Sequence, residues 1–138
     1  MVTLSLLQQM QDDGLGTIDT NLFFQEIALD SQGKARDGVW LVSRGAPVSR
    51  LNINVQQFDL YVRYPNKVTA FTKAEALLEY LKDAYINICD LPACPPYTTQ
   101  TYKDVRIVPL SGIETVGQDE NEKLVLVISG QIQFNKGE

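Results

Sequence analysis

The chain has 138 residues, 44% of them hydrophobic and 21% charged, the balance of a single globular domain spanning residues 1–138. Its net charge of −5 argues against a free nucleic-acid binder, which needs a basic surface to displace counterions from phosphates. The N-terminus has no basic segment, and no stretch approaches the roughly 18 apolar residues of a membrane span. We therefore expect no signal peptide, no membrane contact, and synthesis and use in a cytoplasm.

The first elements follow from apolar spacing. Leu4, Leu7 and Met10 recur every three residues and predict a short amphipathic helix over residues 3–12, with Gly14 as its stop. Residues 21–29 are compatible with a strand, and the apolar run VWLV that follows Gly38 predicts another.

The next predicted strand, residues 51–64, changes its apolar side halfway along. Its apolar positions are first odd and then even: Leu51, Ile53 and Val55, followed by Phe58, Leu60, Val62 and Tyr64. Strand side chains alternate between faces, so an uninterrupted strand cannot keep both sets on one side. A β-bulge at Gln56-Gln57 would reset the alternation, and we favour it. The alternative is a strand that outgrows its domain, with one half meeting a neighbouring subunit.

A long helix is the clearest element. Apolar residues recur at spacings of three and four from Phe71 to Ile88 and predict a helix over about residues 70–88. Thr72 and Glu75 have the spacing of a capping box at its start. The side chains expected to cover the sheet are Phe71, Ala74, Leu77, Leu78, Leu81, Tyr85 and Ile88.

Two further strands end the chain. Residues 102–112 predict a strand with an edge or a break at Pro109, and residues 124–137 predict the last strand after the polar loop 116–123. Together the elements predict an α+β fold: a mainly antiparallel sheet covered by one long helix, plus a short N-terminal helix.

The sequence offers little for catalysis. It has no histidine, the usual general base near neutral pH, and no recognisable nucleophile, phosphate-binding or metal-binding motif. Cys89 and Cys94 lack the further ligands of a zinc site, so we expect free thiols packed as small hydrophobes. For Asp59 we expect one of three roles: it faces solvent, it pairs with an arginine, or it is a buried acid. We predict no enzyme, no cofactor and no metal.

The segments GVWLVSRGAPVS (38–49), NVQQFDLYVRYPN (54–66) and TKAEALLEYL (72–81), in this order, resemble the tail-terminator proteins of long-tailed bacteriophages, also described as tail-completion or minor capsid proteins. The resemblance covers most of the chain and rests on element order. The proline-bearing loop at residues 89–97 departs from it.

The resemblance implies a tail-tube-like fold and a structural role in the virion. The chain would form a ring of six copies, a homohexamer, at the head-proximal end of the tail tube. There it would stop tube polymerisation and present the surface to which the head docks. Its partners would be itself, the tail tube protein and a head-completion or neck protein, and DNA would pass through the lumen without specific binding. Assembly would take place in the host cytoplasm.

Candidate surfaces follow from residue types. Aromatic residues and arginines are common at interface hot spots, and those near the central strands are Trp40, Arg44, Arg50, Tyr61 and Arg63. Acidic side chains facing a lumen would keep DNA from adhering, and the candidates are Glu114, Asp119, Glu120 and Glu122. A solvated loop that aids solubility is the favoured explanation of these acidic residues.

Two alternatives stay open. One is another head–tail neck or tail-tube protein of the same virion. The other is a small bacterial α+β ligand-binding or regulatory domain, with a small molecule in a cleft under the long helix.

Overall fold

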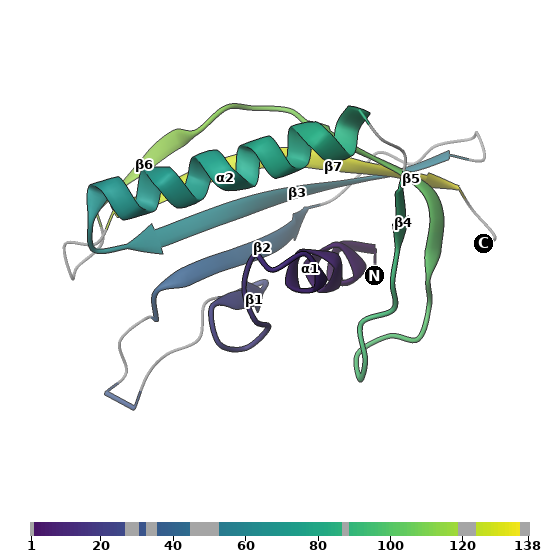
Figure 1. Ribbon diagram of the computed structural model, residues 1–138, viewed down its shortest axis with the longest axis horizontal. Coiled ribbons are helices and arrows are strands. Elements are labelled where there is room, and N and C mark those ends of the chain that lie inside the picture. Colours follow the sequence, from purple (N-terminus) through teal and green to yellow (C-terminus); the bar gives the residue numbers. More distant parts are fainter. Residues whose placement is uncertain are drawn as a thin grey trace.

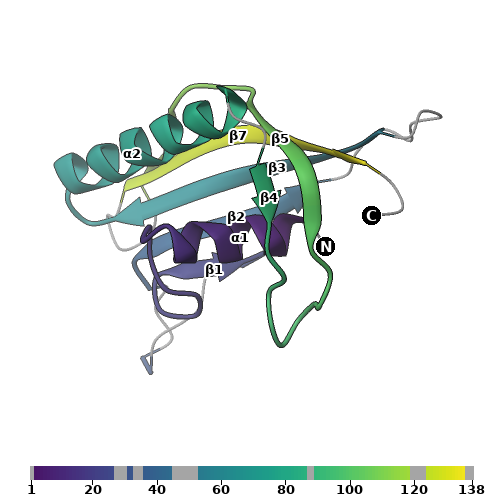
Figure 2. The ribbon, with the colours of Figure 1, turned by 45° about the vertical axis from the view of Figure 1, so that its right-hand side comes forward.

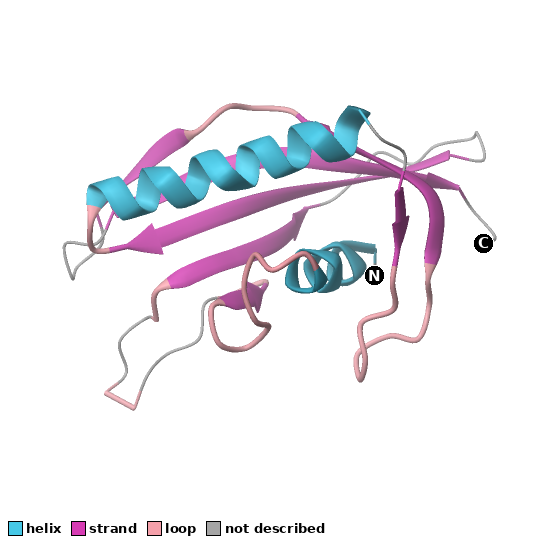
Figure 3. Cartoon of the chain, viewed as in Figure 1, coloured by secondary structure: helices cyan, strands magenta, loops and turns pink. Residues whose placement is uncertain are grey.

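The computed structural model describes residues 2–26, 31–32, 36–44, 53–86, 89–118 and 124–135 (Figure 1). Within these residues the chain forms two helices and seven strands (Figure 3). In chain order they are α1 (Val2–Asp12), β1 (Leu22–Phe24), β2 (Gly38–Arg44), β3 (Ile53–Tyr64), α2 (Lys67–Ile86), β4 (Cys89–Leu91), β5 (Tyr102–Pro109), β6 (Glu114–Gln118) and β7 (Leu124–Asn135).

All seven strands join one sheet in the order β1-β2-β3-β7-β5-β4, and β6 pairs with β7 beyond the end of β5. Only β1 and β2 pair in parallel; the other described pairs are antiparallel. The sheet is curled, since α1 contacts β1 and β2 at one end of it and β4 at the other. Figure 2 shows β4 and β5 bending around α1.

The predicted layering, a sheet covered by one long helix, is wrong. The described chain is mostly β, with 47% of it in strands, and the sheet forms a half-barrel with two short helices. Helix α1 lies inside the curl, whereas α2 runs along β3, β7 and β5 (Figure 1). Two hydrogen bonds join α2 to the segment that follows α1: the Tyr80 hydroxyl donates to Asp13 at 2.8 Å, and the Lys73 ammonium donates to the Leu15 carbonyl at 2.5 Å.

The predicted bulge at Gln56-Gln57 is also wrong. Strand β3 pairs with β7 without a register shift, from Ile53 opposite Asn135 to Tyr64 opposite Leu124. Phe58, Leu60 and Val62 therefore point into the core, where each is fully buried. The odd positions of β3 point to the other face. Strand β2 ends opposite Gln57, so the first part of β3 extends beyond it.

A bulge does occur, in β5. The register between β4 and β5 shifts between Cys89 and Leu91, and Asp104 has a positive φ of 54°. The extra residue lets Tyr102 share the core side with Val105 and Ile107, although their numbers differ in parity. Because a bulge bends and twists its strand, it helps to turn β5 and β4 around α1.

Helix α2 begins before the predicted capping box. Asn66 is its N-cap, and its side-chain oxygen accepts from the backbone amides of Val68 and Thr69 at 2.8 and 3.3 Å. Thr72 lies one turn inside the helix and does not cap it. The buried stripe consists of Ala70, Ala74, Leu77 and Leu81, whereas Phe71 is 39% exposed. Residues 87–88 of the predicted helix lie outside the described residues.

Several other expectations are met. Helix α1 buries Leu4, Leu7 and Met10, and Gly14 ends it with a φ of 83°. The predicted strand at residues 21–29 is described only over β1; residues 27–30 lie outside the description. No helix in the described part of the chain has the length and apolar character to cross a membrane.

Candidate functional site

The sheet face opposite the helices, called here the outer face, carries a stacked aromatic pair. Trp40 of β2 lies opposite Tyr61 of β3, which lies opposite Val127 of β7. Directly paired residues share a face, so all three point away from the core. The Trp40 and Tyr61 rings are stacked with their centroids 5.0 Å apart and their planes 13° apart. All three side chains are half-buried.

Next to this pair, a hydrogen-bonded carboxylate lies across three strands. Asp59 of β3 is only 7% exposed. It accepts a hydrogen bond from the Ser129 hydroxyl of β7 at 2.6 Å and forms an ion pair with Arg44 of β2 at 3.6 Å. Asp59 thus pairs with an arginine, one of the three roles expected for it. These bonds fix the polar part of the outer face to the sheet.

Arg63 is buried within the chain. It is 2% exposed, lies 3.6 Å from the Asp37 carboxylate, and donates to the Arg36 carbonyl at 3.5 Å. A guanidinium enclosed in this way cannot lose its charge partner without cost, and it offers little area to a neighbouring subunit. Of the candidate interface residues, Trp40, Tyr61 and Arg44 lie together on the outer face, and Arg63 lies beneath the segment at residues 36–37.

The acidic candidates are placed only in part. Glu114 is exposed on β6 and pairs with Val127, which puts it at the end of the row that begins at Trp40. Glu114 therefore lies on the outer face with the candidate interface residues Trp40 and Tyr61. If this face is a subunit contact, Glu114 lies in that contact and does not face a lumen. Four other candidates lie outside the described residues: the acidic residues Asp119, Glu120 and Glu122, and the interface candidate Arg50.

The two cysteines are free thiols, as predicted. Cys94 is buried and Cys89 is half-buried. Burial, reinforced by nearby carboxylates, raises the pKa of both thiols. Near neutral pH they are therefore protonated and poor nucleophiles.

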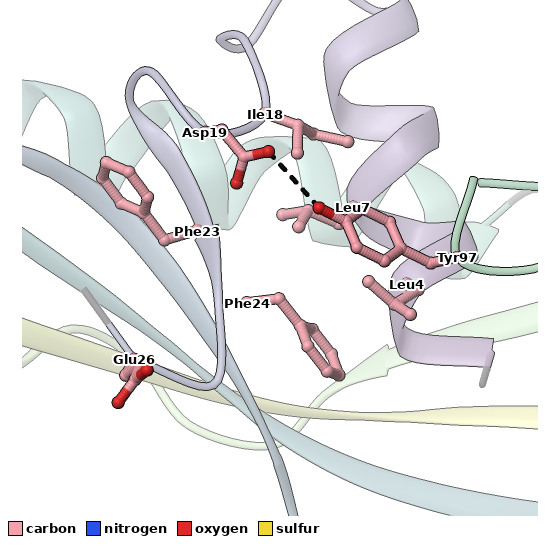
Figure 4. A pocket seen from close by; sticks show the side chains of 8 residues that line it. All are labelled: Leu4, Leu7, Ile18, Asp19, Phe23, Phe24, Glu26 and Tyr97. Atoms are coloured by element: carbon pink, nitrogen blue, oxygen red, sulfur yellow. Dashed lines mark hydrogen bonds between the residues drawn. The ribbon is translucent and has the colours of Figure 1, made fainter. Parts of the chain in front are cut away.

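A pocket that sequence reasoning missed lies between α1, the segment around β1, and the loop that carries Tyr97 (Figure 4). Its volume is about 480 Å³. The lining residues are Leu4, Leu7, Ile18, Asp19, Phe23, Phe24, Glu26 and Tyr97. The expected cleft was under the long helix, whereas this pocket lies beside the short one. Leu4 and Leu7 gave only the periodic signal of a buried helix face, so the sequence held no sign of a pocket there.

Among the described residues, no group of three or more cysteines and carboxylates is arranged to hold a metal ion. A scan against protein-family models finds no match for the chain, and a search of curated proteins finds no significant relative.

Proposed function

We propose that the chain is a structural virion protein that forms a ring at the head-proximal end of a phage tail tube. The ring stops tube polymerisation and provides the docking surface for the head. The proposal combines the resemblance of residues 38–81 to tail terminators with the arrangement of the sheet.

One observation carries the proposal: both helices lie on one face of the sheet, and the outer face presents a fixed aromatic pair at its centre. Ring closure needs a heterologous contact, in which one patch of each subunit meets a different patch of the next. Such contacts have an apolar centre and a polar rim. Trp40, Tyr61 and Val127 supply the centre, and the Arg44–Asp59 pair lies beside it.

The length of the central strands also supports a ring. Strands β3 and β7 have 12 residues each and are paired throughout. At a rise of about 3.4 Å per residue they form a ribbon about 40 Å long, about twice the usual strand length. A ribbon of this length extends past its own neighbour β2 and offers a rigid surface to an adjacent subunit.

On this proposal the partners are further copies of the chain, about six in a closed ring. The others are the tail tube protein on one ring face and a head-completion or neck protein on the other. DNA passes through the lumen without specific contacts. The protein resides in the virion, at the head-proximal end of the tail.

Tube growth provides the test. Purified tail tube protein is allowed to polymerise on preformed tube ends, with and without this chain, and tube lengths are measured by electron microscopy. The proposal predicts that growth stops when the chain is present. Tubes of equal length at all ratios of the two proteins would contradict it.

A further inference from the structure

The pocket beside α1 combines an apolar lining with a partly acidic rim (Figure 4). Its volume of about 480 Å³ lies within the range of small-molecule sites, roughly 300–1,000 Å³. The walls are built from three separate parts of the chain: Leu4 and Leu7 from α1, Phe23 and Phe24 from β1, and Tyr97 from the loop before β5. In Figure 4 the Phe24, Tyr97 and Leu4 side chains border a common space.

Polar groups lie at two places on this lining. The Tyr97 hydroxyl donates to the Asp19 carboxylate at 3.4 Å, and both side chains are exposed. Glu26 lies apart from them, beyond Phe24 (Figure 4). None of the described lining residues is basic. The Arg36 guanidinium lies 5.6 Å from the centre of the Phe23 ring and donates to the Asp19 carbonyl at 3.1 Å. Among the described residues, two carboxylates and one guanidinium leave the rim with an excess of negative charge.

The backbone around the pocket is held in uncommon conformations. Asp19 and Gln25 both have a φ of 69°, and they are two of the three described residues other than glycine with a positive φ. Two hydrogen bonds fix Gln25 in this conformation. Its backbone amide donates to the Leu41 carbonyl at 2.7 Å, and its side-chain oxygen accepts from the Ser43 backbone amide at 2.5 Å. Such conformations persist where the surrounding contacts impose them. They hold Asp19, Phe24 and Glu26 in place around the opening.

We propose that this pocket binds a small organic ligand with an apolar body and one positively charged group. The apolar body fills the space between α1 and β1, and the cation meets the acidic rim at Asp19 or Glu26. An anionic ligand would face the two carboxylates and is disfavoured, while a neutral ligand would gain no attraction from them. This inference is independent of ring assembly, because it uses no residue of the outer face.

The test compares two probes of nearly equal size, phenethylammonium and its neutral isostere phenethyl alcohol. Each is titrated into the intact protein near neutral pH, and binding is followed by backbone amide chemical shifts. The proposal predicts saturable shifts confined to residues around Leu4, Ile18, Phe24 and Tyr97, with the ammonium binding about fivefold more tightly than the alcohol. Equal affinities would show that the pocket takes neutral apolar groups and would overturn the assignment of a cation. Shifts elsewhere, or none that saturate, would overturn the site.

Charge variants test whether the rim carboxylates, and not the net charge of the protein, attract the ammonium probe. Asp19→Asn keeps a residue that tolerates a positive φ, and Glu26→Gln changes an exposed side chain, so both are expected to fold. Each should weaken ammonium binding by about two- to fivefold and leave alcohol binding unchanged. The matched control is Glu75→Gln, which removes the same charge from an exposed site on α2. An equal loss in the control would mean that net charge, and not the rim, attracts the probe.

Discussion

Trp40 and Tyr61 stack across neighbouring strands on the face of the sheet that neither helix covers, with ring centroids 5.0 Å apart. An aromatic pair of this kind contributes about 1 kcal/mol beyond the area it buries. It also forms a rigid, half-exposed surface whose conformational entropy is already lost, which favours its use in a contact with a second subunit.

Substitution of one ring tests this surface. Tyr61→Ala should weaken each subunit contact by about 2 kcal/mol, and the assembly should dissociate while the monomer stays folded. The loss of monomer stability should be about 1–2 kcal/mol, because Tyr61 is only half-buried. Scattering-derived mass, together with circular dichroism, measures both effects.

Phe71→Ala is the matched control, since Phe71 is a partly exposed aromatic residue on α2, away from the outer face. It should leave the assembly intact. If Tyr61→Ala keeps the wild-type mass, or if both variants lose it equally, the outer face is not the contact.

The start of α2 gives a prediction about stability. Asn66→Ala removes the side chain that accepts from two backbone amides and should destabilise the fold by about 1 kcal/mol. Thr72→Ala changes a residue inside the helix and should stay within about 0.5 kcal/mol of the wild type. Urea denaturation distinguishes the two. If Thr72→Ala were the more destabilising of the two variants, Thr72 and not Asn66 would be the N-cap.

This pair of residues shows where sequence reasoning worked and where it did not. The period of the apolar residues in α2 located the helix, because burial of one face imposes that period. It did not locate the start, since Thr72-Glu75 and Asn66 are both valid caps in isolation. The choice is made by packing: Ala70 lies before Thr72 and is fully buried against the sheet.

The face switch in β3 has a similar explanation. A bulge or a strand that extends beyond its own domain would each explain the switch, and only the bulge needs no partner. The pairing of β3 with β7 decides against it, because the two 12-residue strands pair along their whole length without a register shift. The short strands β4 and β6 escaped prediction, since CDL and ETVGQ lack a run of alternating apolar residues and depend on pairing with β5 and β7.

Substitution of Arg63 tests its role in the stability of the fold, independently of any subunit contact. Arg63→Glu would place a negative charge at a site that is 2% exposed and 3.6 Å from Asp37, so it should cost more than about 3 kcal/mol and unfold much of the population. Arg44→Glu changes a side chain that is 56% exposed and should leave the chain folded. Thermal unfolding of the two variants is the measurement. A cooperative transition of Arg63→Glu at the wild-type temperature would contradict the buried ion pair.

Stability should fall at alkaline pH. Burial raises the pKa of Tyr80 above its usual range, and the hydrogen bond to Asp13 adds to the effect. Burial also raises the pKa of Tyr64, Tyr102, Cys89 and Cys94. The folded chain therefore keeps protons that the unfolded chain releases, so the stabilisation is complete below the ordinary pKa values and is lost as the pH rises above about 9.

Lys73 acts in the opposite sense, since burial lowers its pKa, but it is a single group against five. Denaturant unfolding at a series of pH values checks the sign. Tyr80→Phe should flatten the alkaline slope, because it removes the group with the largest shift. Constant or increasing stability over about pH 8–11 would show that these groups titrate alike in the folded and unfolded chain.

The ring itself is tested most directly by its mass and its image. Purified protein is measured by light scattering, then mixed with preformed tail tubes and examined by negative-stain electron microscopy. We expect a closed particle of about six times the 15.4 kDa chain, seated at one end of each tube only. A monomer or dimer at every concentration, with both tube ends bare, would contradict it.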